Sequence, residues 1–222
     1  MALSDVKTAA ARLSTLVDGL DESTARGDSV LPGWSRGHVI THLANFSRAF
    51  TRQVEYALRG ELIEVYDGGR PARDAEIEAG AHRPAAELTA DLNEAVAALL
   101  AAWDRVGPDD WSRPILHRNS TLAQGIDATW RELVIHTSDL GLSSTPDDWP
   151  APFCAHLLEF LRPRTPDGVH LILQPSDGPL WENGTGQDHV LTGTLTALTA
   201  WYAGRPSPTP IAGPAPELLP YP

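Results

Sequence analysis

The most informative stretch of the sequence is Trp130-Arg131-Glu132-Leu133-Val134-Ile135-His136, which sets a carboxylate and an imidazole four residues apart. The pattern predicts a helix, and residues four apart on a helix share one face with Cβ atoms about 5–6 Å apart. Apolar side chains occupy most of the remaining circumference, which predicts a largely buried helix. A buried, ionised Glu132 needs a partner, and a metal ion shared with His136 is one of the few that fits.

A second stretch, Arg36-Gly37-His38-Val39-Ile40-Thr41-His42-Leu43, offers two further imidazoles at helical spacing. We expect His42 to be the third ligand because it lies one turn deeper in the predicted helix, and His38 to pack or support the ligands from behind. Two histidines and one glutamate leave a coordination position open, which is typical of catalytic rather than structural zinc. The alternative is that Glu132 and His136 lie on a solvated face, and the spacing alone favours neither interpretation.

The composition indicates a soluble, acidic protein. The chain has 222 residues, of which 42% are hydrophobic, enough for a sizeable core. It carries 17 Lys and Arg against 29 Asp and Glu, a formal net charge of −12. Such a charge repels a phosphate backbone, so we expect no nucleic-acid partner.

The sequence shows no targeting or membrane signal. The start, Met1-Ala2-Leu3-Ser4-Asp5-Val6-Lys7, lacks a charged-then-apolar pattern, and no apolar run approaches the ~20 residues of a membrane span. We therefore expect a cytoplasmic location and no membrane partner. Cys154 is the single cysteine, which rules out an intramolecular disulfide, and its apolar flanks predict a buried small hydrophobe. Nothing in the sequence indicates an oligomeric state.

The first part of the chain, residues 1–145, is predicted to be a four-helix bundle with at least one long connection. Apolar residues recur at helical spacing in four long segments, about residues 4–20, 36–59, 85–106 and a last one that begins at residue 122 or 126 and ends at 140. Between the second and third segments, residues 61–84 are expected to be looser, with a turn or loop at Asp67-Gly68-Gly69-Arg70-Pro71.

The pattern changes after residue 145, and residues 146–205 are predicted to form a small α+β domain. A linker-like stretch comes first, and the predicted order is then a helix, three strands and a second helix, at 153–161, 168–174, 178–182, 189–193 and 194–203. The last segment, residues 206–222, holds seven prolines without periodicity. We expect this tail to wrap the surface or remain mobile.

Three segments together resemble a known family. Residues 31–44 (LPGWSRGHVITHLA) and 130–141 (WRELVIHTSDLG) are similar to two motifs of the mycothiol-dependent maleylpyruvate isomerase family, and residues 190–205 are similar to its C-terminal module. The resemblance covers roughly residues 5–205. It implies a DinB-like metal-binding four-helix bundle followed by a sterol-carrier-like α+β domain.

The resemblance also implies site residues. His42, Glu132 and His136 match the family's ligands for a divalent metal, usually zinc, and mycothiol is the implied cosubstrate. Arg205 matches a C-terminal arginine thought to serve the active site. An arginine of the middle loop is implicated as well, and of Arg70 and Arg73 we favour Arg73.

Two neighbours of the ligands have weaker predicted roles. Asn45 lies three residues after His42 and is expected to point into the same cavity, with a core hydrogen bond as the alternative. Asp139 lies about one turn after His136, where it either orients that imidazole or faces solvent.

These observations predict a metal-dependent enzyme that activates a small-molecule thiol. The thiolate would add reversibly to the double bond of an unsaturated acid, as in an isomerase, or attack an electrophile, as in an S-transferase. Arg205 and Arg73 would bind substrate carboxylates. The alternatives are a metal-dependent hydrolase and a non-catalytic module that binds small molecules. The sequence leaves the electrophilic substrate open.

Overall fold

The computed structural model describes residues 3–207 and 209–222, and the chain divides into two compact units. The first unit ends at Ser144, and the second spans Thr145–Pro222. The predicted helical bundle followed by an α+β domain is confirmed. No helix in the described ranges is both long and apolar enough to cross a bilayer.

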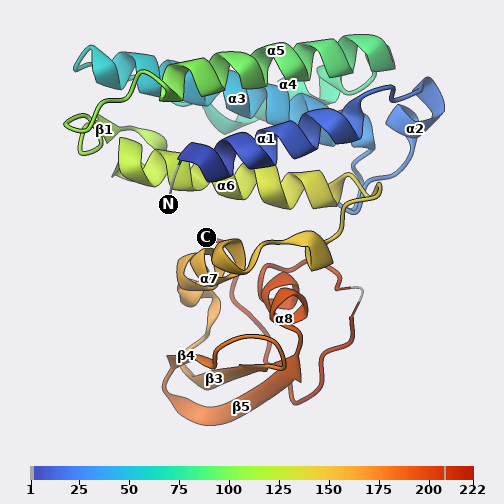
Figure 1. Ribbon diagram of the computed structural model, residues 1–222, viewed down its shortest axis with the longest axis vertical. Helices are drawn as coiled ribbons and strands as arrows, with labels where there is room; N and C mark the ends of the chain where they lie inside the picture. The colour runs from blue at the N-terminus through green and yellow to red at the C-terminus, as the bar shows by residue number, and fades with distance from the viewer. Residues whose placement is uncertain (1–2, 208) are drawn as a thin grey trace. The chain divides into compact units, whose positions relative to one another are not determined.

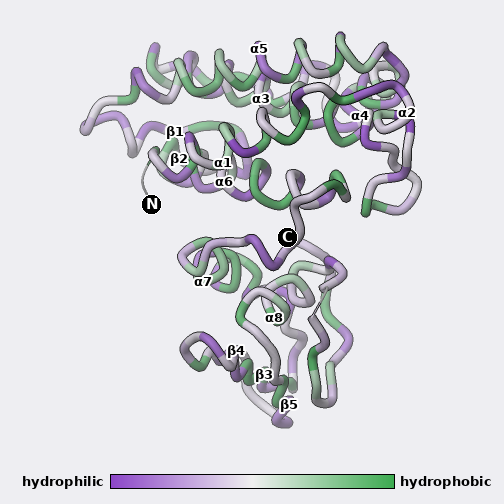
Figure 2. The backbone as a smooth tube through the Cα atoms, turned by 45° about the vertical axis from the view of Figure 1, so that its right-hand side comes forward, coloured by the Kyte–Doolittle hydropathy of each residue, from purple (hydrophilic) through white to green (hydrophobic). Residues whose placement is uncertain are grey.

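In the first unit, four long helices pack in a ring (Figure 1). Helix α3 packs against α5 and α6, and α1 packs against the same two helices from the other side. Along the Cα tube, hydrophobic and hydrophilic stretches alternate on these helices, as expected for a bundle with one buried face each (Figure 2). The four helices are α1 (Leu3–Val17), α3 (Arg36–Leu58), α5 (Ala85–Trp103) and α6 (Leu122–Asp139).

Helix α3 is the central element of the bundle, and its start is fixed by a reciprocal cap. The Ser35 side chain accepts the backbone N–H of His38, while the His38 ring accepts the backbone N–H of Ser35. The ring of His38 thereby gives the Ser35 N–H a partner, while the His38 N–H is shared between the Ser35 side chain at 3.4 Å and the Ser35 carbonyl at 3.1 Å. Because the cap fixes where α3 begins, it also fixes how far along the helix His42 lies.

Two shorter helices, α2 (Glu22–Arg26) and α4 (Gly69–Gly80), connect the long ones. The expected turn is present at Asp67-Gly68, but helix α4 begins directly after it, where a looser segment was expected. Gly68 caps the helix with φ 77°, and Pro71 falls in its first turn. The missing N–H of proline costs nothing at that position, because those N–H groups have no partner inside the helix. The glycine–proline cluster therefore marks a helix start.

A short hairpin, which the sequence patterns did not predict, precedes α6. Strands β1 (Pro114–Ile115) and β2 (Ser120–Thr121) pair in antiparallel fashion around the single turn η1 (His117–Asn119). Arg118 and Asn119 both have positive φ values, 54° and 50°. Such values are uncommon for residues other than glycine, and the turn holds two of them in succession.

The second unit is a three-stranded sheet accompanied by two helices. The strand order is β4-β3-β5, with β3 antiparallel to β4 and parallel to β5 (Figure 1). Helix α8 packs against α7 and against strands β3 and β5. The elements are η2 (Pro146–Asp148), α7 (Ala151–Phe160), η3 (Arg162–Arg164), β3 (Gly168–Pro175), β4 (Trp181–Gly184), β5 (Gly186–Gly193) and α8 (Leu195–Tyr202).

The chain crosses from β4 to β5 past the start of β3, and only glycine fits there. A Cβ on Gly186, whose φ is +133°, would lie 2.1 Å from the carbonyl oxygen of Gly168. A Cβ on Gly184, whose φ is +79°, would lie 2.3 Å from that of Val169. The parallel pairing of β3 with β5 depends on this crossing.

The proline-rich tail is attached to the second unit at several points. The backbone of Ala212 exchanges two hydrogen bonds with Thr192 of β5, both 2.9 Å. Leu219 likewise donates its backbone N–H to the carbonyl oxygen of Arg164.

Candidate metal centre

Helices α3 and α6 bring His42, Glu132 and His136 together. Glu132 Oε2 lies 2.9 Å from His42 Nε2 and 3.3 Å from His136 Nε2. The ligand-type atoms of all three residues lie within 4.8 Å of one another. Glu132 and His136 meet because they are one turn apart on α6, and His42 meets them because α3 packs against α6.

The three side chains are buried to different degrees. The His42 side chain is 5% exposed and that of His136 is 14% exposed, whereas Glu132 keeps 31% of its side chain accessible. Trp34 covers the His42 ring at an edge-on contact with centroids 5.8 Å apart. The cluster is therefore held within the bundle but open to small molecules on the side of the carboxylate.

Asp139 supports His136 from behind. Its Oδ2 lies 2.9 Å from His136 Nδ1, and its side chain is 1% exposed. Of the two positions expected for this residue, the structure has the one that faces the imidazole. A carboxylate at Nδ1 keeps the proton on that nitrogen and leaves the Nε2 lone pair for a ligand on the other side of the ring.

The cluster is strongly coupled electrostatically. Burial disfavours the imidazolium of His136, but the carboxylates of Asp139 and Glu132 outweigh it and raise the pKa of His136 to about 9. Burial also raises the pKa of Glu132, yet hydrogen bonds and charges from His136 and His42 hold that pKa well below its usual range. Burial is the main reason that the pKa of His42 is lowered. At neutral pH Glu132 is therefore an anion between the neutral imidazole of His42 and the imidazolium of His136, whose proton a bound cation would displace.

Arg73 of α4 reaches the same cluster. Its Nη2 lies 3.1 Å from His42 Nδ1, and its Nη1 donates to Asp74 at 2.6 Å. Arg70, the other arginine considered for this role, is exposed at the start of α4. Of the two middle-loop arginines, Arg73 is therefore the one that contacts a predicted ligand.

The donor set fits a divalent cation. Two imidazole nitrogens and one carboxylate oxygen make the ligand set of a catalytic zinc site. His136 is oriented for this by Asp139. His42 fits once Arg73 releases Nδ1, because a histidine that binds a cation through Nε2 carries its proton on Nδ1 and cannot accept there. Arg73 is a long side chain on another helix, so this release needs no backbone movement.

A second group, formed by His38, Glu78 and His82, fits a cation less well although its atoms lie equally close. The backbone N–H of Ser35 donates to His38 Nδ1 at 3.1 Å, which places the ring proton on Nε2. That Nε2 lies 3.2 Å from Glu78 Oε2, as a hydrogen-bond donor. His38 therefore caps α3 and has no lone pair for a metal, consistent with its expected packing role.

Sequence reasoning did not single out Tyr66, which lies beside the cluster. The Cζ atom of Arg73 lies 5.9 Å from the centre of its ring. Burial raises the pKa of Tyr66, and the charges of Arg73 and Glu132 also act on it. Tyr66 belongs to a segment without periodicity, so no pattern in the sequence could have placed it near Glu132.

Other predicted site residues have contacts of their own. Asn45 is half-buried, and its Oδ1 accepts a hydrogen bond from Arg48 at 3.4 Å. Arg205 follows α8 in the second unit, where its Nη1 donates to the Ala203 carbonyl at 3.3 Å. Cys154 is fully buried, and burial raises the pKa of its thiol to about 11. Its sulfur is therefore a packed, protonated thiol at neutral pH.

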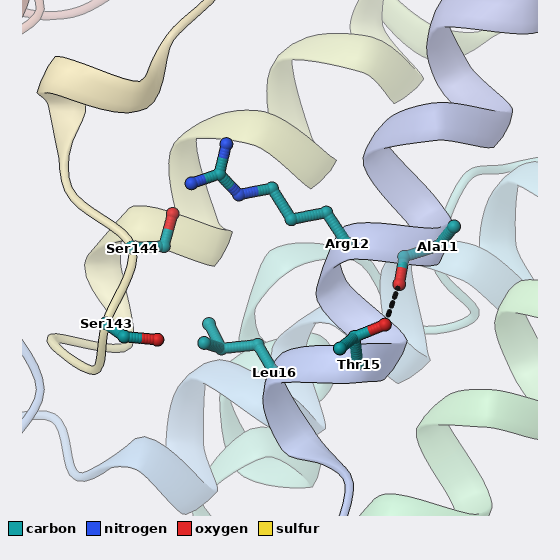
Figure 3. A pocket seen from close by; sticks show the side chains of 6 residues that line it. All are labelled: Ala11, Arg12, Thr15, Leu16, Ser143 and Ser144. Atoms are coloured by element: carbon teal, nitrogen blue, oxygen red, sulfur yellow. Dashed lines mark hydrogen bonds between the residues drawn. The ribbon is translucent and has the colours of Figure 1, made fainter.

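A pocket of about 530 Å³ lies elsewhere on the first unit (Figure 3). Arg12 extends along it toward Ser144, while Thr15 turns its hydroxyl back to the Ala11 carbonyl at 3.0 Å. None of the three clustered ligands lines this pocket.

Comparison with known proteins places the chain in a family. The family model described as mycothiol maleylpyruvate isomerase N-terminal domain matches residues 6–141, and the MDMPI C-terminal domain matches residues 148–220. This chain belongs to the mycothiol maleylpyruvate isomerase family. The resemblance drawn from the sequence motifs is confirmed.

Two solved structures of this family are similar to the chain over nearly its whole length. They are a mycothiol-dependent maleylpyruvate isomerase and a histidine-to-alanine mutant of it, 27% and 26% identical with TM-scores of 0.87 and 0.85. Each match covers 98% of this chain and 94% of the other. The curated proteins gave no match.

Proposed function

We propose that this chain is a metal-dependent, mycothiol-using enzyme that isomerises an unsaturated acid through reversible addition of a thiolate. The convergence of His42, Glu132 and His136 on one open-sided cluster carries the proposal. The similarity to a mycothiol-dependent isomerase over both units favours isomerisation above S-transfer. The cytoplasmic location expected from the sequence stays a prediction.

The cluster would hold the ion, and zinc suits two imidazoles with one carboxylate. When bound, such a cation lowers the pKa of a coordinated thiol and so supplies a thiolate at neutral pH. The thiol would come from a small molecule, because burial keeps the Cys154 thiol protonated. Asp139 would keep the His136 ring in the orientation that ligation needs.

Arginines would hold the acid. The guanidinium of Arg73 lies at the rim of the cluster, 3.1 Å from His42 Nδ1, and can bind a carboxylate in bidentate fashion. Arg205 is proposed as a second anchor because it matches the family's C-terminal arginine, and Asn45 is proposed to contact the thiol cosubstrate. The two arginines would orient the acid so that its double bond faces the sulfur of the thiol.

In this scheme the sulfur electron pair forms a C–S bond at the end of the double bond remote from the carbonyl. The C=C π pair then becomes a double bond to the carbonyl carbon, and the C=O π pair moves to the carbonyl oxygen. The former double bond is then single and rotates. Expulsion of the thiolate restores the double bond in the trans geometry. Thiol and protons are regenerated, so the reaction needs no oxidant or reductant.

Metal content tests the proposal. We expect purified wild-type protein to hold about one zinc per chain, and His42→Ala and His136→Ala to lose it. His38→Ala is the matched control, because it removes an imidazole from the same helix, one turn before His42. The His38 ring caps α3 and has no free lone pair for a metal. Metal retained by His42→Ala would overturn the proposal and leave a non-catalytic binding module.

Thiol dependence separates the remaining alternatives. With metal bound, the chain is expected to isomerise maleylpyruvate only when mycothiol is added. Turnover with water in place of the thiol would instead indicate a metal-dependent hydrolase.

A further inference from the structure

The segment that joins α3 to α4 is fixed to α3 at two points. The buried side chain of Gln53 donates to the Ile63 carbonyl at 2.6 Å. Arg52, the preceding residue on α3, makes two hydrogen bonds of 2.9 Å with the carboxylate of Asp67. Tyr66 lies between these two attachments, so its backbone is held at a defined place beside the bundle.

Arg73 lies between Tyr66 and the proposed ligand His42 and contacts both. The Cζ atom of Arg73 lies 5.9 Å from the centre of the Tyr66 ring, and the same guanidinium contacts His42 Nδ1 at 3.1 Å. A carboxylate bound to Arg73 would therefore lie within reach of the phenol. A side-chain hydrogen bond with Arg73 also acts on the pKa of the phenol, which places the Tyr66 hydroxyl beside that guanidinium.

Tyr66 has a proton to donate. Burial raises the pKa of its phenol, which the charge of Glu132 reinforces and that of Arg73 opposes. At neutral pH the group is an uncharged O–H beside a cation. Such a pair is suited to an oxygen atom that becomes negative during a reaction, because the guanidinium stabilises the charge and the phenol supplies a directed hydrogen bond.

We propose that Tyr66 is a catalytic hydrogen-bond donor, which stabilises the carbonyl oxygen of the unsaturated acid while thiolate is added to it. The inference rests on the proposed function. As the C–S bond forms, the C=C π pair becomes a double bond to the carbonyl carbon, the C=O π pair moves onto the carbonyl oxygen, and the Tyr66 O–H donates to that oxygen. When the thiolate leaves, the pair returns to carbon and the proton remains with Tyr66.

Tyr66→Phe tests this role because it removes one oxygen atom and keeps the ring. In the metal-loaded full-length protein, with mycothiol and maleylpyruvate as probes, we expect kcat to fall about 10²–10³-fold, as when one oxyanion donor is removed. KM, zinc content and thermal midpoint are expected to stay near wild type. Tyr56→Phe is the matched control, because Tyr56 also packs on an arginine, with Arg59 Cζ 4.0 Å from its ring.

A second measurement does not need turnover. Oxalate, a dianion with one carboxylate for Arg73 and further anionic oxygens for the phenol, is expected to bind Tyr66→Phe at least about tenfold more weakly than wild type. Tyr56→Phe is expected to bind oxalate like wild type. Wild type, Tyr66→Phe and Tyr56→Phe would all hold the same metal. A difference in oxalate affinity would therefore report the contribution of the Tyr66 hydroxyl alone.

The inference is overturned if Tyr66→Phe keeps both kcat and oxalate affinity within about twofold of wild type. It is also overturned if kcat falls only in step with zinc content or thermal midpoint, which would mean that the phenol merely packs against Arg73. Failure of the proposed function would be seen in a different variant, as retention of metal by His42→Ala. Failure of the role of Tyr66 would be seen in Tyr66→Phe, so the two failures can be distinguished.

Discussion

At the level of single residues, Asp139 controls how His136 presents its ring. The carboxylate is 1% exposed and lies 2.9 Å from Nδ1, on the side of the ring opposite to the cluster. A carboxylate in this position fixes the tautomer and raises the basicity of the ligating nitrogen. The sequence placed Asp139 one turn after His136 but left open whether it turned inward, because a residue at a helix end faces either way.

We predict that Asp139→Asn weakens metal binding about 10–100-fold while the fold is kept. The amide has the shape of the carboxylate but lacks the charge that raises the basicity of His136. Zinc affinity can be measured by competition with a chromogenic chelator. An affinity within a factor of two of wild type would show that Asp139 has no supporting role.

The charge state of His136 predicts a pH dependence of stability in chelator-treated protein. Its pKa is raised from the ordinary 6.5 to about 9, so the folded protein holds this proton more tightly than the unfolded chain does. The resulting stabilisation is fully present below pH 6.5 and is lost as the pH rises through about 9. Urea unfolding should show this loss in wild type and a smaller loss in Asp139→Asn. Equal pH dependence of the two proteins would contradict the assignment.

At the level of elements, the sequence was sufficient to predict the long helices, because apolar residues recur at helical spacing and capping residues mark the helix starts. Helices α3 and α6 carry apolar stripes, and each begins at a hydroxyl residue, Ser35 and Thr121. Helix α4 was missed because glycine and proline at its start also occur in loops. The hairpin before α6 was missed because its strands are two residues long and carry no alternation.

Gln53 shows how contacts invisible in the sequence hold such irregular segments. Its Oε1 accepts the backbone N–H groups of Leu116 and His117 at 3.0 and 3.3 Å, and its Nε2 donates to the Ile63 carbonyl. One buried amide on α3 thereby joins the hairpin and the segment that carries Tyr66. No spacing rule relates residues 53, 63 and 116, so only the folded chain shows this connection.

We predict that Gln53→Leu lowers the free energy of unfolding by about 1–3 kcal/mol, because it leaves three part-buried backbone groups without this partner. Urea denaturation measures the change. Gln187→Leu, at an exposed position of β5, is the control and is expected to stay within about 0.5 kcal/mol of wild type. Equal stabilities of the two variants would argue against the role given to Gln53.

At the level of the whole molecule, the proposed ligands all belong to the unit that ends at Ser144. The sequence located the two motifs but could not show that they meet, since 90 residues separate His42 from Glu132. Their meeting depends on α3 packing against α6, a tertiary contact. For the second unit, the alternating and apolar runs predicted the strands, whereas the crossing between β4 and β5 depends on glycines that look like ordinary turn residues.

This division predicts that damage to the second unit spares metal binding. Gly186→Ala places a Cβ 2.1 Å from the Gly168 carbonyl oxygen at a φ of +133°, which costs about 1–3 kcal/mol in backbone strain before the clash is counted. We expect early proteolysis within Thr145–Pro222 and unchanged zinc per chain. Loss of zinc in step with proteolysis would show that the site needs both units.

The most direct test of the account is an anomalous difference map at the zinc edge from crystals of the metal-loaded protein. We predict one strong peak about 2.0–2.2 Å from His42 Nε2, Glu132 Oε2 and His136 Nε2. A peak at His38, Glu78 and His82 instead, or none between α3 and α6, would contradict it.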